Sequence, residues 1–394
     1  MELLKYSPLK YRIAVGTLFF NQGIIFSAWA TRIPDFKTAL SMTESQLGTL
    51  LFALPLGQIL MMMVSGWLIA KFSSRNVMKF SGFLHPAMLL LLASANSYTQ
   101  LFWSLLLFGM CANLTNISIN TQAIDVERIY GRSINASFHG IWSLAGFVGG
   151  LLTSMLVGCK IGVWTHFIGV VVYIWMMLIF TIKYLVPSDS TSQKSANDEG
   201  KTRSIFAPTP YILLLGVLTF ACMSCEGAMF DWSVIYFRDV IGTPENISRI
   251  GFASFMSAMA CGRFLADFFI NKFGRMALLR LSGILVCIGM VSAIVSPSAI
   301  TGIVGFVFVG FGVSSVVPTC YSLAGRSRRM PSGMAIATVS TIGFFGFLLF
   351  PPIIGYIAEI SSLRFSFALM GLVGVFVSLM SPLLRNRIAE IEKK

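Results

Sequence analysis

Long apolar runs recur along nearly the whole chain and are separated by short segments that contain most of its Lys and Arg residues. About 20 consecutive apolar residues form a helix long enough to cross the roughly 30 Å of hydrocarbon in a bilayer. Because backbone groups in hydrocarbon have no water to bond, such runs must satisfy their hydrogen bonds internally, as helices. The 394 residues are 56% hydrophobic and only 11% charged, which excludes a soluble globular protein of this size.

The runs predict an all-α integral membrane protein with about twelve transmembrane helices. They lie near 11–31, 46–70, 77–95, 101–123, 134–158, 162–186, 209–230, 247–271, 276–295, 300–324, 333–358 and 363–384. The first run is too long, and too polar at Asn21 and Gln22, for a cleaved signal peptide, so we expect it to remain.

The distribution of Lys and Arg predicts the orientation in the membrane. If the N-terminus is cytoplasmic, the inner segments carry 23 of these residues and the outer segments carry 6. Such an excess is typical of cytoplasmic loops, so we expect a bacterial inner-membrane protein with both termini in the cytoplasm. The net charge of +13 then reflects topology, and no nucleic-acid partner is expected.

The chain divides into two halves that repeat one design. Residues 187–208 are Ser-rich and mixed in charge, and they predict a flexible cytoplasmic linker between six-helix bundles at 1–186 and 209–394. Ser-x-x-Gly-Phe-x-Gly occurs at 143–149 and again at 340–346. Repeated helical halves are typical of secondary transporters, which bind substrate between the halves and alternate access to it.

Two loops carry a family resemblance. "GWLIAKFSSRNVMK" (66–79) and "GRFLADFFINKFGR" (262–275) resemble the Gly-x-Leu-x-Asp-Arg-x-Gly-Arg loop of the major facilitator superfamily, which the chain resembles over nearly its whole length. In that family the loop latches the cytoplasmic side while the outer side is open. The resemblance implies this role for Arg75, Asp267 and Arg275, although the first copy has Ala70 in place of the Asp.

Four further stretches resemble the fucose-permease-like branch of that superfamily, particularly its YbjJ-like members. They are "SAWATRIPDFK" (27–37), "NTQAIDVERIYGR" (120–132), "SFHGIWSLAG" (137–146) and "CEGAMFDWS" (225–233). The resemblance implies a bacterial inner-membrane porter. Fucose permeases carry a Glu just before an Asn in the fourth span, whereas 113–120 here has no carboxylate. Fucose is therefore not the expected substrate, and the coupling group must lie elsewhere.

Glu226 is a carboxylate within an apolar run. A charge at such depth costs about 2.5–3.5 kcal/mol even on the most lenient scale. Glu226 must therefore face a wet cavity or take up a proton, because burial disfavours its charged form. We interpret it as the proton-coupling group; the alternative is a neutral, hydrogen-bonded structural residue.

Amide side chains mark a candidate substrate surface. Asn113, Asn116 and Asn120 share one helix face, and buried amides need partners. Paired donors and acceptors suit a hydroxyl-rich solute, while interhelical hydrogen bonding is the alternative. The full candidate set for substrate binding is Asn21, Gln22, Asn113, Asn116, Asn120, His139, Trp142 and Ser143.

Charged residues at the ends of runs are candidate gates. Arg32 and Asp231 lie at matching ends of the first and seventh runs, where they can pair across the halves and separate when the outer side opens. Asp125 and Glu127 lie at the inner end of the fourth run and can pair with basic loops such as 326–329. Ordinary solvated boundary charges are the alternative for both sets.

These features together favour proton-coupled symport of a small polar solute, and a sugar or sugar derivative is the first solute class to consider. We expect a monomer with no cofactor and no metal, whose partners are the solute, protons and the lipid bilayer. Proton-driven efflux of amphipathic compounds is one alternative, although the drug-antiporter pattern Gly-Pro-x-x-Gly-Gly reads Gly-Phe-Val-Gly-Gly at 146–150. A passive facilitator would leave Glu226 uncoupled.

A membrane-embedded enzyme acting on lipid or glycan is a third alternative, and it requires a nucleophile or metal cluster near one interface. The three histidines occupy three different runs, which argues against such a cluster. The sequence also has no Gly-x-x-x-x-Gly-Lys-Ser/Thr phosphate loop, so ATP-driven transport is not expected. We therefore do not expect an enzyme.

Overall fold

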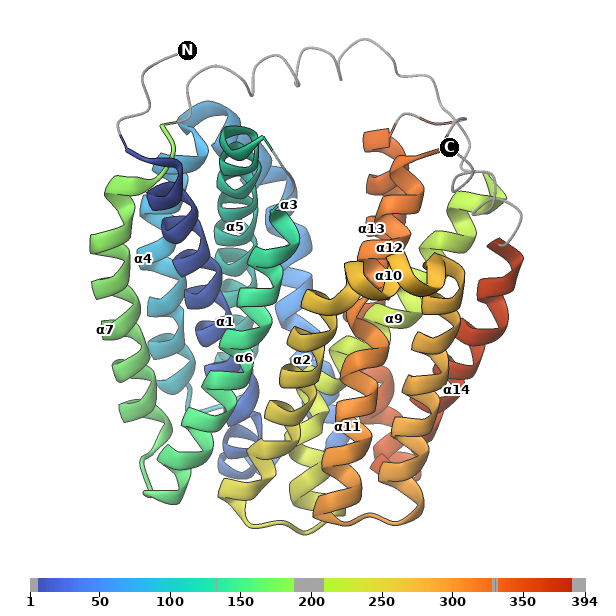
Figure 1. Ribbon diagram of the computed structural model, residues 1–394. Coiled ribbons are helices and arrows are strands. Elements are labelled where there is room, and N and C mark those ends of the chain that lie inside the picture. The colour runs from blue at the N-terminus through green and yellow to red at the C-terminus, as the bar shows by residue number, and fades with distance from the viewer. Residues whose placement is uncertain (1–5, 132–133, 188–208, 328–329, 331, 385–394) are drawn as a thin grey trace. The chain divides into compact units, whose positions relative to one another are not determined.

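The structure, a computed structural model, describes residues 6–131, 134–187, 209–327, 330 and 332–384, and every regular element in these ranges is helical. The elements of the first half are α1 (Pro8–Ala39), α2 (Glu44–Leu51), α3 (Ala53–Phe72), α4 (Ser74–Ala93), α5 (Tyr98–Tyr130), α6 (Asn135–Gly158), α7 (Val163–Thr181) and the 3-10 turn η1 (Ile182–Tyr184) (Figure 1). The elements of the second half are α9 (Pro210–Ile235), the π-helical turn η2 (Tyr236–Val240), α10 (Glu245–Val295), α11 (Ala299–Ser314), α12 (Val316–Gly325), α13 (Ser332–Ile360), α14 (Leu363–Met380) and the 3-10 turn η3 (Ser381–Leu384).

Eleven helical segments in the described ranges are long and apolar enough to cross a membrane. The expected runs 247–271 and 276–295 both lie in α10, which is interrupted at Gly274. Gly274 has a φ of 79° and a ψ of 159°, a backbone conformation that glycine adopts at little cost. The predicted all-α membrane fold is confirmed. The expected linker lies outside the described residues from position 188 onward.

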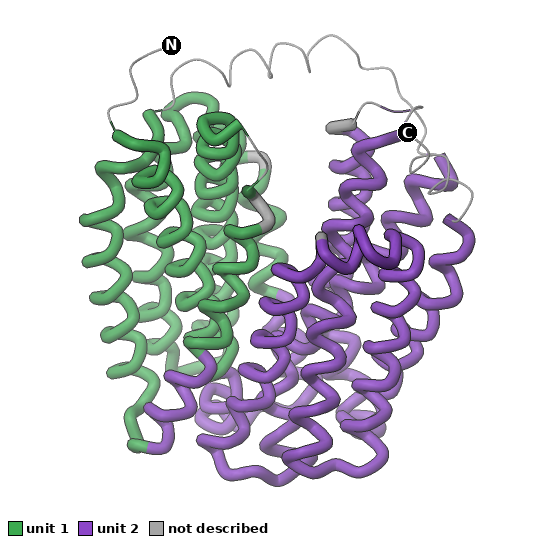
Figure 2. Tube along the Cα trace, in the orientation of Figure 1, with its two compact units in different colours: residues 1–32, 53–149, 159–205 green, residues 33–52, 150–158, 206–394 purple. Residues whose placement is uncertain are grey.

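The chain forms two compact units (Figure 2). Unit 1 comprises residues 1–32, 53–149 and 159–205, and unit 2 comprises residues 33–52, 150–158 and 206–394. Most of each sequence half therefore lies in its own unit. Residues 33–52, which we call the α1–α2 corner, belong to the first half by sequence and to unit 2 by packing.

A proline lies where α1 passes from one unit to the other. Pro34 is inside α1, and its ring nitrogen has no hydrogen for the carbonyl of Ala30, which removes one helical hydrogen bond. Helices bend most readily at such positions. This local weakness lies two residues beyond Arg32, the last residue of α1 in unit 1.

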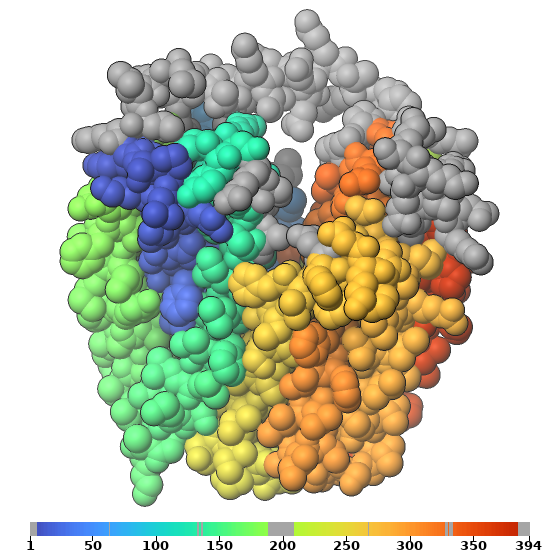
Figure 3. All heavy atoms as spheres, in the orientation of Figure 1, coloured from blue at the N-terminus to red at the C-terminus, as the bar shows by residue number. Residues whose placement is uncertain are grey.

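The core of unit 1 consists of apolar side chains from α1, α4, α5, α6 and α7, and it includes Phe19 stacked on Phe138 at a ring-centroid distance of 5.4 Å. The helix α7, light green at the left of Figure 3, also has large apolar side chains that are exposed, such as Phe180 at 68%. Large apolar side chains on both the inside and the outside of a helix bundle indicate a surface that contacts lipid.

The α9–α13 contact in unit 2 requires glycine at position 346. A β-carbon there would lie 2.6 Å from the carbonyl oxygen of Phe220 and 2.8 Å from the amide nitrogen of Ser224. Those atoms belong to the backbone of α9 and cannot move aside independently. Small residues at such contacts let two membrane helices approach closely.

We predict that Gly346→Ala lowers the unfolding temperature in detergent, because overpacking costs about 1–3 kcal/mol. Gly169→Ala on α7 is the matched control, since a β-carbon there meets nothing within 4 Å. That control should be neutral or slightly stabilising. Equal unfolding temperatures for both variants would contradict the α9–α13 contact.

Candidate functional site

Glu226 and Arg263 form an ion pair inside unit 2. Glu226 lies in the middle of α9, Arg263 lies in the first part of α10, and the Arg263 Nη2 donates to the Glu226 Oε1 at 2.7 Å. The Glu226 side chain is 6% exposed and that of Arg263 is 18% exposed. The two charges compensate one another where water is scarce, and removal of either one leaves the other in an unfavourable environment.

One further helix contributes a polar group near this pair. Tyr321 on α12 interacts with the side chain of Ser340 on α13 and lies within electrostatic reach of Glu226. We call Glu226, Arg263 and Tyr321 the Glu226 site. It brings together side chains from α9, α10 and α12, so a change of charge at Glu226 affects several helices of the unit.

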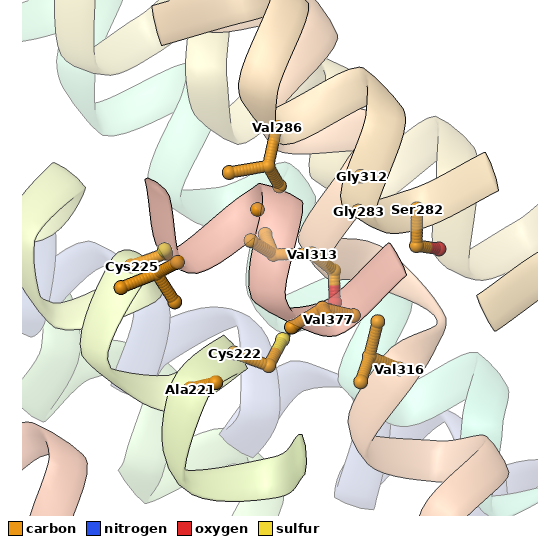
Figure 4. Close-up of a pocket in the computed structure, with 12 residues that line it drawn as sticks. Ala221, Cys222, Cys225, Ser282, Gly283, Val286, Gly312, Val313, Val316 and Val377 are labelled. Atoms are coloured by element: carbon orange, nitrogen blue, oxygen red, sulfur yellow. Dashed lines mark hydrogen bonds between the residues drawn. The ribbon is translucent and has the colours of Figure 1, made fainter. Parts of the chain in front are cut away.

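A small pocket is lined by α9 residues that lie within about one helical turn of Glu226 in the sequence, including Cys222 and Cys225 (Figure 4). It has about 10 Å³ of space open to the centre of a water molecule, and it is lined by Cys222, Cys225, Ser282 and otherwise small apolar residues from α9, α10, α11, α12 and α14. The thiol of Cys222 donates to the Val313 carbonyl at 3.4 Å, and that of Cys225 donates to the Met370 carbonyl at 3.9 Å. We call it the cysteine pocket. Both of its thiols therefore have protein partners. Among the described residues, no cluster of three or more His, Cys, Asp or Glu side chains is placed to hold a metal ion.

The α1–α2 corner is held in unit 2 by charged side chains. Asp35 forms a salt bridge with Arg249, whose side chain is 1% exposed. Lys37 forms salt bridges with Glu44 and, at 2.8 Å, with Asp239 of η2. Arg238 and Asp239 follow one another in the π-helical turn η2, and both contact the corner. Turns of π-helix are frequent at functional sites.

Backbone groups of the corner are also bound. The Arg238 side chain donates to the carbonyl of Pro34 and to the hydroxyl of Thr38, both at 2.9 Å. The carboxylate of Glu359 on α13 accepts from the backbone N–H groups of Glu44, at 2.9 Å, and Ser45, at 3.3 Å. A carboxylate at a helix N-terminus satisfies otherwise unbonded N–H groups and complements the helix dipole. Glu359 therefore fixes the start of α2.

The candidate substrate residues of α5 and α6 differ in exposure. Asn116 and His139 are exposed, and the Asn120 amide donates to the Asn116 side chain at 3.1 Å. Asn113 instead accepts a hydrogen bond from Ser65 at 2.9 Å, and Ser143 is buried and donates to the carbonyl of His139 at 3.2 Å. Trp142 is partly buried, with its ring 5.5 Å from that of Phe26.

The two amides of α1 lie inside unit 1. Asn21 is 4% exposed and Gln22 is 8% exposed. The Gln22 amide nitrogen donates to the carbonyl of Ala112 at 3.4 Å. Both residues line an internal cavity between α1, α4, α5 and α7.

The candidate gate residues at the ends of α1 and α9 lie in different units. Arg32 is buried in unit 1, where it donates to the Ile161 carbonyl at 2.7 Å and to His166 Nδ1 at 3.3 Å. Asp231 is partly buried in unit 2. Their pairing stays a prediction.

The inner gate candidates have local partners. Asp125 pairs with Arg128 on the same helix at 3.5 Å, and the Glu127 carboxylate accepts from the backbone N–H of Ile134 at 2.9 Å. Arg75 and Arg275 are partly buried. The side chain of Asp267 and residues 328–329 lie outside the described part of the chain.

Two groups of residues were missed from the sequence. Arg263 was counted with the inner loop bases although it lies in the expected run 247–271, and a basic residue in such a run is itself a signal for a buried partner. Asp35 and Arg249 were missed because each looks like an ordinary charge near the end of a run. Only the tertiary structure brings them together.

The sequence profile of the Major Facilitator Superfamily matches residues 13–332. The chain belongs to this superfamily. It is 31% identical over 365 residues to an MFS-type transporter of Yersinia pestis, covering 93% of both chains. It is 30% identical over 368 residues to the membrane protein MosC of Rhizobium meliloti, covering 93% of this chain and 88% of that one. The protein is therefore a multi-pass membrane transporter.

Solved structures share its fold. The nucleoside transporter NupG matches with a TM-score of 0.72 and 12% identity, covering 95% of this chain and 98% of that one. A D-xylose–proton symporter matches with a TM-score of 0.71 and 14% identity, covering 94% and 97%. At this identity the likeness concerns the fold alone.

We predict that Arg263→Met destabilises the protein more than the double variant Glu226→Gln/Arg263→Met. Loss of one partner of a buried ion pair costs about 3–5 kcal/mol, because it leaves an uncompensated charge, whereas removal of both charges avoids that cost. Thermal unfolding of the purified variants in detergent measures the order of their stabilities. A double variant less stable than Arg263→Met would contradict the conclusion that Glu226 and Arg263 form a buried ion pair.

We also predict that Asp35→Asn loosens the α1–α2 corner. The reporter is Leu47→Cys on α2, a fully buried position, after replacement of the exposed Cys159 and Cys261 by Ser. Asp35→Asn should raise the maleimide labelling rate at position 47 about tenfold, which corresponds to about 1.4 kcal/mol.

Glu245→Gln provides the matched control for this experiment, since it removes an exposed charge from the first turn of α10 but keeps both Asp35 and the backbone carbonyl of position 245, to which Arg249 also donates. It should leave the labelling rate at position 47 unchanged. Equal rates with and without Asp35→Asn would show that the salt bridge does not hold the corner.

Proposed function

We propose that the protein is a proton-coupled symporter of a small polar solute, with a sugar or sugar derivative as the first class to test. Transport proceeds by alternating access between six-helix bundles at 1–186 and 209–394 across the inner membrane of a bacterium, with both termini in the cytoplasm. We also propose that it belongs to the fucose-permease-like, YbjJ-like branch of the superfamily, because of the four sequence stretches that resemble that branch.

The observation that carries the proposal is the buried pair of Glu226 and Arg263. When Glu226 binds a proton, the negative charge that compensates the Arg263 guanidinium is lost. The hydroxyl or carboxylate oxygens of a solute can then accept from Arg263. Proton binding therefore favours solute binding, and solute binding favours proton binding by the same factor.

The same pair favours symport over proton-driven efflux by antiport. An antiported cation would bind the Glu226 carboxylate and compete with the proton for it. That competition requires Glu226 to be free of Arg263, whereas the two lie 2.7 Å apart. A solute that offers acceptors to Arg263 fits this geometry better than a cation does.

Four side chains of unit 1 that are exposed or partly buried support a hydroxyl-rich solute. Asn116 and Asn120 offer amide donors and acceptors, while His139 and Trp142 add a ring nitrogen and an aromatic face. Structures that share the fold include a D-xylose–proton symporter and a nucleoside transporter. We therefore assign these four residues to substrate contact, and pentoses and nucleosides belong in the first pools tested.

The charges of the α1–α2 corner support a gating role. Alternating access requires the corner to separate from the rest of unit 2 in one part of the cycle. The Asp35–Arg249 and Lys37–Asp239 salt bridges would then break and form again. Arg32 with Asp231 are proposed partners at the same end of the helices. Arg75, Asp125, Glu127, Asp267 and Arg275 are proposed for the opposite end.

The test uses proteoliposomes loaded with a pH-sensitive dye, to which pooled sugars, sugar acids, nucleosides and amino acids are added. Solute should acidify the lumen with wild type. Glu226→Gln should abolish the acidification, because glutamine cannot carry the proton. The variant should retain exchange of labelled solute for unlabelled solute, since glutamine mimics the protonated state. Glu245→Gln is the matched control and should behave as wild type.

Each other outcome has a defined meaning. Acidification that persists in Glu226→Gln would exclude Glu226 as the obligatory proton carrier. Labelled solute that enters wild-type vesicles without acidification would establish a facilitator or a different coupling ion. Efflux becomes the better function if no pool moves protons or label but amphipathic cations do.

A further inference from the structure

The internal cavity of unit 1 is a second polar site, separate from the Glu226 site. Twelve residues from α1, α4, α5 and α7 line it, all of them buried, and they leave about 10 Å³ open to the centre of a water molecule. A cavity of this size holds about one water. The cysteine pocket has the same volume, so the chemistry of the two linings can be compared directly.

The cavity is lined by polar atoms that lack protein partners. Both amide atoms of Asn21, the Oε1 of Gln22 and both ring nitrogens of His85 are buried without a hydrogen bond. His85 is 2% exposed and packs against the ring of Phe108 at a centroid distance of 4.8 Å. Buried polar groups in proteins are almost always hydrogen-bonded, to protein or to ordered water. Such a concentration of unsatisfied atoms around one cavity indicates a ligand.

A backbone carbonyl in the cavity wall adds to this set. Pro86 lies inside α4 and, together with Gly82, lines the cavity. Because proline has no N–H, the Gly82 carbonyl four residues earlier lacks its usual α-helical donor. Water often inserts at such breaks in a helix. The dipeptide His85-Pro86 is therefore the sequence signal for this site.

The hydrogen-bond donors and acceptors of the cavity lining indicate which kind of ligand fits. None of the twelve lining residues is Asp, Glu, Lys or Arg, so an ion would be left uncompensated. A neutral histidine offers one donor and one acceptor, and the two amides offer the remaining groups. One water can accept from Asn21 and His85 while it donates to Gln22 and to the Gly82 carbonyl.

We propose that this cavity binds one ordered water molecule, which joins α1 to α4 through Asn21, Gln22 and His85. The cysteine pocket stays dry, because its thiols already donate to backbone carbonyls. The water ties the first part of α1 to unit 1, whereas the last part of α1, from residue 33, packs in unit 2. Asn21 and Gln22 thus anchor the helix that connects the two units.

Hydroxyl-radical footprinting of the full-length protein in detergent tests the proposal. Radicals generated from a bound water oxidise the nearest sulfur atoms even when they are shielded from bulk solvent. Met78 lines the cavity and is 2% exposed. Cys222 and Cys225 line the cysteine pocket and are 3% and 1% exposed, so they are internal controls of an oxidisable residue type.

Met78 should be oxidised several-fold faster than Cys222 and Cys225 in the wild-type protein. In Asn21→Leu/His85→Phe, which replaces the polar lining by apolar groups, the rate at Met78 should fall to that of the two cysteines. Oxidation of Met78 no faster than of the cysteines would overturn the proposal, and so would an unchanged rate in the folded double variant. If that variant does not fold, the wild-type comparison alone decides.

Discussion

A charged or polar group inside an apolar helix bundle must find a partner, and this requirement determines where the important residues of the protein lie. Glu226 is stable in the middle of α9 because Arg263 reaches it from α10. Arg249 is stable at 1% exposure because Asp35 reaches it from the end of α1. In both cases the partner comes from a different helix, so the pair also determines which helices stay together.

The two units meet this requirement with different chemistry. Unit 2 uses ion pairs, in which transfer of one proton changes the net charge and releases a strong donor. The cavity of unit 1 instead brings together amides, a histidine and a proline-interrupted helix, and none of its twelve lining residues is Asp, Glu, Lys or Arg. We infer that unit 2 responds to protons at the Glu226 site, whereas unit 1 holds α1 in a fixed position. A transporter needs both properties, because coupling requires a group that changes state and a frame that does not.

Much of the fold could be predicted from the sequence, because each membrane-spanning helix is a local pattern. The length of the apolar runs predicted the helices, and Glu226 was found because one carboxylate in an apolar run is conspicuous. Arg263 was equally conspicuous in its own run, but the charge count assigned it to a loop. The Asp35–Arg249 pair could not be predicted in this way. It joins positions 214 residues apart, and neither residue differs from a boundary charge in its local sequence.

The assignment of the α1–α2 corner to unit 2 has a consequence for work with parts of the protein. A cut in the region 188–208 separates the two sequence halves, but it does not separate the two compact units. The first fragment would carry α2, whose buried residues include Leu47, Leu50 and Leu51, without the helix α13 that packs against α2. The second fragment would expose the complementary surface, including Gly355, where α13 meets the backbone of Gly48. Each fragment is thus incomplete on its own, and co-expression of both in one membrane is the condition under which they can assemble.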